Sequence, residues 1–248
     1  LKNQVSQGLL LPLSPTCDNI ESELFEGLDV TSPLGIQKWE PVLPASLSGQ
    51  AKGQFPSFGR KTDQERIENL EHEVFVDNKH SVYEVTLKLD GSSCSVYFRD
   101  GEVGVCSRNL ELKINEENAE NSFIATATKT NLLSALTKLG KNIMVQAELM
   151  GPGVQGNLEK LIKHELYVFD IFDIDQQRYL TPDERVATFK ELVDAGFTGK
   201  HVPIIAHNVT LADINIADVA SSKVFVNRPS INSSLAEGCV FKRMDGQF

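Results

Sequence analysis

The chain has 248 residues, 41% of them hydrophobic and 23% charged, which is ordinary for a globular protein with a substantial core. Its apolar runs fall short of the roughly 18 residues of a membrane-spanning helix, no signal peptide is visible, and the four scattered cysteines form no zinc motif. We therefore expect an intracellular protein without a membrane partner, and the net charge of −10 limits any basic nucleic-acid surface to a local groove.

The first 40 residues are rich in proline, glycine, serine and acidic residues, with short apolar patches between them. The chain starts at Leu1 rather than at methionine, and its opening stretch has the pattern of the end of a strand. We therefore expect residues 1–40 to be the tail of an upstream module with a linker, and residues 41–248 to form the main domain.

Strand patterns dominate the main domain. Residues 81–99 alternate apolar and polar side chains and are broken at Asp90-Gly91, which predicts two strands. Asp100-Gly101 then predicts a tight hairpin turn to a return strand, because this dipeptide favours such turns. Further strands are expected at residues 143–150, 166–174 and 238–243.

Helices interrupt these strands. Residues 118–139 have helical periodicity and end at Gly140, a common helix stop. Residues 181–184 (TPDE) predict a capped helix start, followed by a helix to about Ala195. Shorter helical patterns cover residues 61–70 and 211–220. Strands joined by hairpins and interrupted by helices favour an α+β fold built on antiparallel sheets with flanking helices.

Five short patterns carry candidate chemistry, and the first is KLDG at residues 88–91. A lysine attacks phosphorus only as the neutral amine, so a neighbouring cation must lower the pKa of Lys88 from its reference value of ~10.4. Gly91 would let the backbone pass close to a bound nucleotide. The ordinary alternative is a surface turn between two strands.

The other four patterns are also ambiguous when taken singly. Glu148 lies in an apolar strand followed by glycine, where it is either exposed or in need of a partner. Phe169 is either a core residue or a purine-stacking ring, and strand alternation puts it on the face of Tyr167, opposite Val168 and Asp170. The remaining two are SRN at residues 107–109 and EGCVFKR at residues 237–243, each of which also fits a polar strand end or a surface strand.

Together, the five patterns resemble the covalent nucleotidyltransferase superfamily of ATP-dependent ligases and capping enzymes, and they occur in that family's order. KLDG resembles its motif I, SRN its motif Ia, AELMG its motif III, YVFDIF its motif IIIa and EGCVFK its motif IV. The SRN form, with SQGLLLP and KWEP upstream, is similar to ATP-dependent RNA ligases that carry an N-terminal OB domain and seal 3′-OH/5′-phosphate nicks.

The resemblance implies a nucleotidyltransferase domain that uses ATP with Mg²⁺ or Mn²⁺ and acts on nicked RNA or an RNA-containing duplex, with an upstream OB domain in the same chain. It implies AMP carried on Lys88, a metal near the α-phosphate held by Asp90, Glu148 and Glu237, and nucleotide contacts from Arg108, Glu148, Phe169 and Lys242. The family's motif V lysines would follow Phe248, so they are not among these 248 residues.

Two other functions stay open at this point. A DNA ligase or a GTP-dependent capping enzyme shares the KxDG pattern, although SRN and SQGLLLP favour an RNA ligase. A non-catalytic nucleotide-binding module could keep the fold without the chemistry. The presence of Lys88, Asp90, Glu148 and Glu237 favours catalysis.

Overall fold

A computed structural model describes residues 25–31, 33–35, 49–211, 217, 219 and 228–247. They belong to two units, Leu1–Val42 and Leu43–Phe248. In the first unit, the Thr31 N–H donates to Asp29 Oδ1 at 2.9 Å and the Leu34 N–H donates to the Val30 carbonyl at 3.0 Å. The opening stretch at residues 1–13, expected to end a strand, and the KWEP pattern at residues 38–41 lie outside the described residues.

The second unit contains a larger sheet with the strand order β1-β5-β4-β3-β6-β7-β8, in which β9 also pairs with β7. Its strands are β1 (Ala51–Gln54), β3 (Ser92–Arg99), β4 (Glu102–Cys106), β5 (Leu110–Leu112), β6 (Ile143–Met150), β7 (Glu165–Asp173), β8 (Arg178–Tyr179) and β9 (Lys200–His201). Neighbouring strands are antiparallel except for the β7–β9 pair, which is parallel. The expected α+β fold with antiparallel sheets is confirmed.

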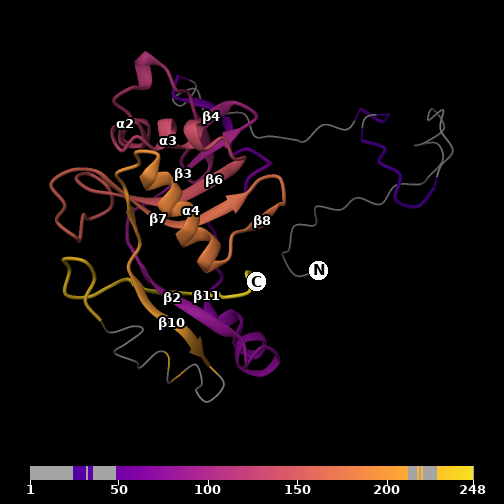
Figure 1. Cartoon of the computed structure of the whole chain (residues 1–248), viewed down its shortest axis with the longest axis vertical. Coiled ribbons are helices and arrows are strands. Elements are labelled where there is room, and N and C mark those ends of the chain that lie inside the picture. The colour runs from indigo at the N-terminus through magenta and orange to yellow at the C-terminus, as the bar shows by residue number, and fades with distance from the viewer. Residues whose placement is uncertain are drawn as a thin grey trace. The chain divides into compact units, whose positions relative to one another are not determined.

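A smaller sheet has the order β10-β2-β11, with β2 at its centre. Its strands are β2 (Val82–Lys88), β10 (Ile204–Thr210) and β11 (Gly238–Arg243). Figure 1 shows this sheet below the larger one. Because β2 and β3 are consecutive in the chain but belong to different sheets, the connection at residues 89–91 passes from one sheet to the other.

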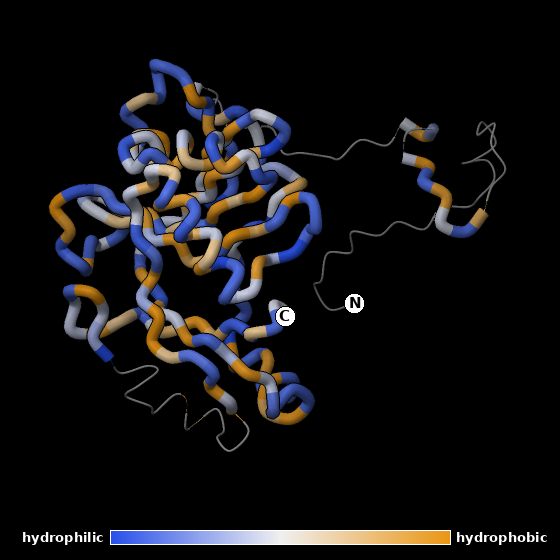
Figure 2. The backbone as a smooth tube through the Cα atoms, in the orientation of Figure 1, coloured by the Kyte–Doolittle hydropathy of each residue, from blue (hydrophilic) through white to orange (hydrophobic). Residues whose placement is uncertain are grey.

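Three helices cover one face of the larger sheet: α2 (Ser122–Lys129), α3 (Leu132–Leu139) and α4 (Pro182–Asp194). Their apolar sides pack with strand residues into the main core, which includes Ala135, Val145 and Ile171, all fully buried. Figure 2 shows the hydrophobic residues concentrated along these packed elements and the hydrophilic ones along the loops. Among the described residues, no helix is both long and apolar enough to cross a membrane.

The opposite face of the larger sheet carries two further clusters. One contains Phe55, Tyr97, Cys106, Met144, Phe172 and Ile174. The other joins the two sheets and contains Leu87, Leu89, Met150, Tyr167, Val202 and Ala236. This second cluster fixes the end of β2 against the ends of β6 and β7, so the region between the sheets is where the polar motif residues meet.

Local signals predicted several elements correctly. The Asp100-Gly101 turn joins β3 to β4 with both residues in left-handed conformations, at φ values of 50° and 91°. The strands at residues 143–150 and 238–243 have the expected bounds. Helix α4 begins with the expected capping box, in which the Glu184 N–H donates to Thr181 Oγ1 and the Thr181 N–H donates to Glu184.

Two helix predictions were wrong, and long-range contacts explain why. The expected helix at residues 118–139 is split at Asn131, which has a φ of 59°; the Thr130 carbonyl there accepts the Thr198 N–H instead of continuing the helix. The expected helix at residues 61–70 is limited to the short turn η2 (Ile67–Asn69). The turns η3 (Glu73–Asp77) and η4 (Glu116–Asn118) complete the described elements, and most of the helix expected at residues 211–220 lies outside them.

Candidate functional site

A cavity of about 510 Å³ lies between the two sheets. All seven residues singled out from the sequence line it: Lys88, Asp90, Arg108, Glu148, Phe169, Glu237 and Lys242. They come from the β2–β3 connection, the residues after β4, the strands β6 and β7, and the start and end of β11. The fold therefore brings together motif residues that are up to 154 positions apart in the sequence.

Lys88 is the last residue of β2, and the β2–β11 register pairs it with Gly238. This register puts the preceding residue, Glu237, beside the lysine, and Lys88 Nζ donates a hydrogen bond to Glu237 Oε1. The two side chains are 44% and 38% exposed. The amine at the cavity is therefore held as an ion pair that solvent and a ligand can both reach.

Gly91 makes the closest backbone approach in the motif. A Cβ at this position would lie 2.5 Å from the Leu149 carbonyl oxygen and 2.9 Å from Glu148 Cγ, so any side chain would collide with β6. Gln155 Nε2 also donates to the Gly91 carbonyl at 3.1 Å. The glycine is thus required for packing the nucleophile turn against β6, a reason that the sequence interpretation had not included.

Glu148 carries the strongest electrostatic signal in the cavity. Burial raises the pKa of Glu148 to about 8, and the charges of Glu237 and Asp90 raise it as well, whereas the Gly91 backbone hydrogen bond and Lys88 lower it. The charges of Glu237 and Asp90 therefore disfavour the ionised form of Glu148. A cation placed among them would reduce this unfavourable charge, because it stabilises the ionised form of each carboxylate.

The three carboxylates do not form a compact ligand cluster by themselves. Among the described residues, no group of three or more His, Cys, Asp or Glu side chains is arranged to hold a metal ion directly. An all-oxygen donor set around a wide cavity still suits Mg²⁺ or Mn²⁺, since these ions prefer oxygen ligands and Mg²⁺ usually keeps several waters. The residues present therefore fit a divalent ion that is held partly through water.

Phe169 lies at an irregularity in β7. Gln146 of β6 pairs with Asp170 and the next residue, Ala147, pairs with Val168, so Phe169 is the extra residue of a β-bulge. Phe169 packs in the cluster between the sheets together with Tyr167, as expected, while Val168 faces the helices. The expectation that Asp170 points away from Phe169 was wrong, because the bulge interrupts the alternation and Asp170 also faces β11.

Lys242 contacts both Asp170 and the backbone of the β7 bulge. Lys242 Nζ lies 2.6 Å from Asp170 Oδ1 and donates to the Phe169 carbonyl at 2.5 Å. The ammonium is also 5.6 Å from the centre of the Phe169 ring. Burial lowers the pKa of Lys242, and the neighbouring Asp170 charge opposes that shift. In this structure Lys242 holds the bulge of β7 in place, and its direct contact with phosphates stays a prediction.

Arg108 contacts residues 61–66, an extended segment that lines the cavity and is called here the strap. Its Nη2 lies 2.7 Å from Asp63 Oδ1, and both side chains are well exposed. Thr62 and Ser93 share a hydrogen bond at 2.7 Å, and Lys61 Nζ donates to the side chain of the residue after Arg108 at 3.1 Å. These contacts hold residues 61–63 in an extended path, which explains why the expected helix does not form there.

The strap also supplies cavity residues that sequence reasoning missed, namely Thr62, Asp63, Gln64 and Arg66. Arg66 is notable because, among the described residues, its side chain makes no hydrogen bond or ion pair, whereas Lys88, Arg108 and Lys242 all do. In the sequence, only the positive charge of Arg66 pointed to a role in binding, and it lies in residues 61–70, whose apolar spacing favoured a helix.

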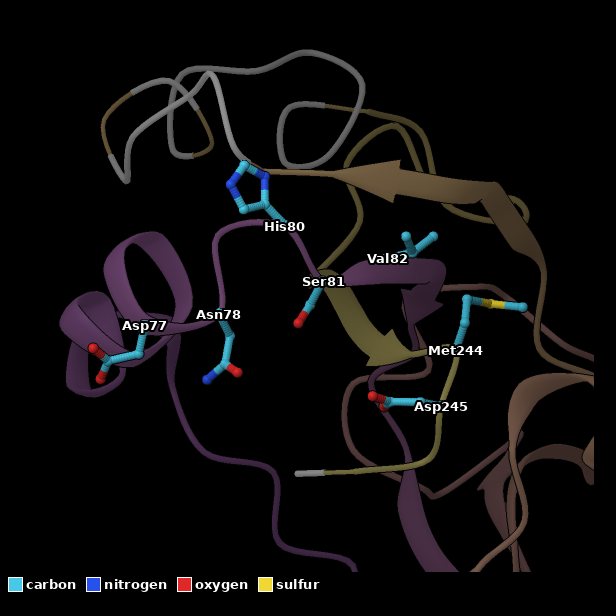
Figure 3. A pocket seen from close by; sticks show the side chains of 7 residues that line it. All are labelled: Asp77, Asn78, His80, Ser81, Val82, Met244 and Asp245. Atoms are coloured by element: carbon cyan, nitrogen blue, oxygen red, sulfur yellow. The ribbon is translucent and has the colours of Figure 1, made fainter.

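A second hollow, of about 660 Å³, lies at the far end of the smaller sheet, and Figure 3 shows the seven side chains around it. It contains none of the motif residues. Its two carboxylates already have partners, since Asp77 Oδ2 lies 3.2 Å from His72 Nδ1 and Asp245 Oδ2 lies 2.7 Å from Arg243 Nη2. The cavity between the sheets is therefore the candidate site, although it is the smaller of the two.

Comparisons with known protein families and solved structures found clear matches. Residues 81–248 match the protein family described as RNA ligase. The chain is similar to solved structures of a Naegleria gruberi RNA ligase. A variant with ATP and Mn is 43% identical, with a TM-score of 0.74, and the match covers 100% of this chain and 70% of that one. The structures with PPi and with AMP and Mn have the same identity and TM-score and cover 100% and 71%. No curated protein sequence matches.

Proposed function

The chain belongs to the RNA ligase family, and from this premise we propose that it joins RNA ends with ATP through AMP carried covalently on Lys88. The observation that carries the proposal is the position of Lys88 at a cavity lined by three carboxylates, an aromatic ring and further cations. A nucleotide needs each of these features: a nucleophile for the α-phosphate, a surface for the base and positive charge for the phosphates.

In the first step, the neutral Lys88 amine attacks the α-phosphorus of ATP. A nitrogen–phosphorus bond forms, the bond from the α-phosphorus to the bridging oxygen breaks, pyrophosphate leaves with the electron pair, and the amine loses a proton. The Lys88 amine contacts Glu237, and this contact must break before the amine can attack. Asp90, Glu148 and Glu237 are the residues that would hold Mg²⁺ or Mn²⁺, which supplies positive charge to the transferring phosphoryl group.

The other cavity residues position the nucleotide in this proposal. Phe169 offers a ring face to adenine, with its backbone held by Lys242. Arg66 has no partner among the described residues, so it is available to a phosphate. Arg108 can exchange its exposed contact with Asp63 for the ribose or a phosphate, because an exposed ion pair contributes little stability.

Two further steps complete the proposed reaction. The AMP moves from Lys88 to a 5′-phosphate, and a 3′-OH then attacks that phosphate and releases AMP. We propose nicked RNA or an RNA-containing duplex as the substrate and an upstream OB domain as part of the same protein. An intracellular location is part of the proposal, supported by the free thiols of Cys94, Cys106 and Cys239 in the described part of the chain.

Incubation with α-labelled ATP and, separately, α-labelled GTP tests the proposal. We expect label from ATP only, an added mass of one AMP on Lys88, and no label on Lys88→Ala or Lys88→Arg, since a guanidinium stays protonated and is a poor nucleophile. Label from GTP would support a capping enzyme. A folded protein that takes no label would support a non-catalytic module, and AMP on another residue would refute the assignment of Lys88. RNA and DNA at each position of a 5′-phosphate nick then separate RNA ligase from DNA ligase.

A further inference from the structure

Two loops lie side by side (Figure 1): residues 151–164, between β6 and β7, of which Gln155 lines the cavity, and residues 228–236, before β11. The Glu159 side chain joins them. This carboxylate is buried and accepts the N–H groups of Asn232 at 2.5 Å and Ser233 at 3.0 Å, while Asn232 Nδ2 donates to the Glu159 carbonyl at 3.0 Å. The two loops therefore form one surface, called here the clamped platform.

The platform has a defined backbone shape. In the first loop, Gln155, Asn157 and Lys160 have φ values of 44°, 44° and 50°, a left-handed conformation that non-glycine residues adopt at an energetic cost. The Asn157 side chain stabilises the bend, because it donates to the Leu161 carbonyl and accepts the Leu161 N–H, both at 3.0 Å. Such strain persists only where surrounding contacts enforce it, and it is concentrated at functional surfaces.

The platform is continuous with the reacting residues on both of its loops. Gln155 Nε2 donates to the Gly91 carbonyl at 3.1 Å, which links the first loop to the turn after Lys88. The second loop leads directly into Glu237, the partner of Lys88. A strand that lies on the platform can therefore reach the cavity with one end.

The charge of the platform is opposite to that of the whole chain. Its residues include Lys160, Lys163 and Arg228 but a single acidic residue, Glu159, whose carboxylate is buried and hydrogen-bonded, whereas the whole chain carries −10. The two lysines are exposed and make no ion pair or side-chain hydrogen bond among the described residues. The nearby Glu165 binds Lys200 Nζ at 2.6 Å and attracts Lys163 only through space, without a direct ion pair.

Apolar side chains accompany these cations. Ile162 is 94% exposed, Leu235 58% and Leu158 52%, and all three belong to the platform. Exposed apolar groups beside unpaired lysines match a polynucleotide, which presents phosphates together with base and ribose faces. A protein partner would bury the apolar groups without a need for the two cations.

We propose that the clamped platform binds the RNA strand that presents its 5′-phosphate end to the cavity, with strand phosphates at Lys160 and Lys163 and nucleoside faces against Leu158, Ile162 and Leu235. This inference rests on the proposed function and adds a surface for the polynucleotide. It separates the residues that grip RNA from the residues that activate ATP.

The test compares Lys160→Ala/Lys163→Ala with a matched control, Lys129→Ala/Lys190→Ala. The control removes two exposed lysines from α2 and α4, on the face of the larger sheet away from the cavity. Binding of a 5′-phosphorylated nicked RNA duplex is measured at several salt concentrations, together with lysyl-AMP formation and AMP transfer to the RNA.

We expect the platform variant to form lysyl-AMP at the parent rate, to bind RNA about tenfold or more weakly, and to lose about 0.7 to 0.9 per lysine from the slope of log affinity against log salt. The control should match the parent in all three measurements. RNA affinity and a salt slope equal to those of the control would overturn the inference and point to a protein occupant. A parent that binds RNA through the platform but forms no lysyl-AMP would refute the proposed function alone.

Discussion

Gly238 of β11 pairs with Lys88 of β2, and this register places the Glu237 carboxylate on the Lys88 amine. The contact joins the first and the last of the five motifs across the smaller sheet. The Lys88 amine is therefore held by a residue that lies 149 positions later in the chain, directly before β11.

The carboxylates around Lys88 are expected to be required for its adenylation. Asp90→Ala, Glu148→Ala and Glu237→Ala should each lower the rate of lysyl-AMP formation by about 10²–10³, the loss typical of a group that stabilises developing charge. Rates with labelled ATP at saturating Mg²⁺ or Mn²⁺ provide the measurement. Glu191→Ala is the control, since Glu191, on α4, makes an exposed ion pair with Lys141. If all three variants form lysyl-AMP within about threefold of the parent rate, these carboxylates are not required for adenylation.

Gly91 should tolerate no side chain. Gly91→Ala forces a Cβ to within 2.5 Å of the Leu149 carbonyl oxygen, so we expect a loss of about 1–3 kcal/mol of folding stability and a shifted Lys88 turn. Gly53→Ala is the control, because its Cβ would meet no atom within 4 Å. Thermal unfolding and lysyl-AMP formation measure the two effects. Equal melting temperatures for both variants would contradict the packing explanation.

Phe169 should contribute to ATP binding through its ring rather than through its apolar volume. Stacking on a base is worth roughly 1–3 kcal/mol, so Phe169→Ala should raise the KM for ATP about tenfold or more. Phe169→Leu keeps most of the packing between the sheets but loses the ring. We expect both variants to show the raised KM. A normal KM in Phe169→Leu would instead make Phe169 a core residue.

The start of α4 should show a distinct pH dependence of stability. The bond to Arg178 holds the pKa of Glu184 at about 2, and the Thr181 backbone N–H lowers that pKa too. Because this pKa is below the unfolded-state value of about 4.5, ionised Glu184 stabilises the fold above pH ~4.5, and the gain disappears as the pH falls toward ~2.

Glu184→Gln tests this sign. Its melting temperature should lie below that of the parent at pH 7, and the difference should shrink between pH ~4.5 and ~2. The ion pair is 41% and 43% exposed, so the difference should also shrink at high salt. A constant difference from pH 7 to pH 2 would show that the carboxylate charge is not the cause.

The parts of the fold that were predictable depend on residues close together in the sequence. The Asp100-Gly101 turn and the Thr181–Glu184 capping box each need contacts across only three or four positions. The motif residues could be assigned to one cavity only because their order resembles a known family. Neither periodicity nor composition would have brought Lys88 and Glu237 together.

The parts that failed depend on distant partners. Helix α2 ends at Lys129, and the next carbonyl, that of Thr130, accepts the Thr198 N–H. No pattern within residues 118–139 encodes this contact. Phe169 sits in a bulge whose carbonyl accepts a hydrogen bond from Lys242, on the other sheet. The strap at residues 61–66 is extended, and its contacts go to Ser93, Arg108 and Asn109, more than 30 positions away. Each case is a long-range contact that overrides a local preference.

The last prediction concerns Arg66, the cavity cation that sequence reasoning missed. Within the described part of the chain its side chain makes no ion pair or hydrogen bond, whereas the triphosphate of ATP would offer it an anionic partner. Arg66→Ala should therefore raise the KM for ATP about tenfold or more, since one charge-assisted contact contributes about 1.5–3 kcal/mol. Arg66→Lys keeps the charge but not the planar fork, so it should restore part of the loss. Melting temperatures should stay near that of the parent, because the side chain packs in none of the apolar clusters. The KM values for ATP of the two variants, measured by lysyl-AMP formation, decide the question: an unchanged KM in a folded Arg66→Ala variant would show that the phosphates do not use this residue.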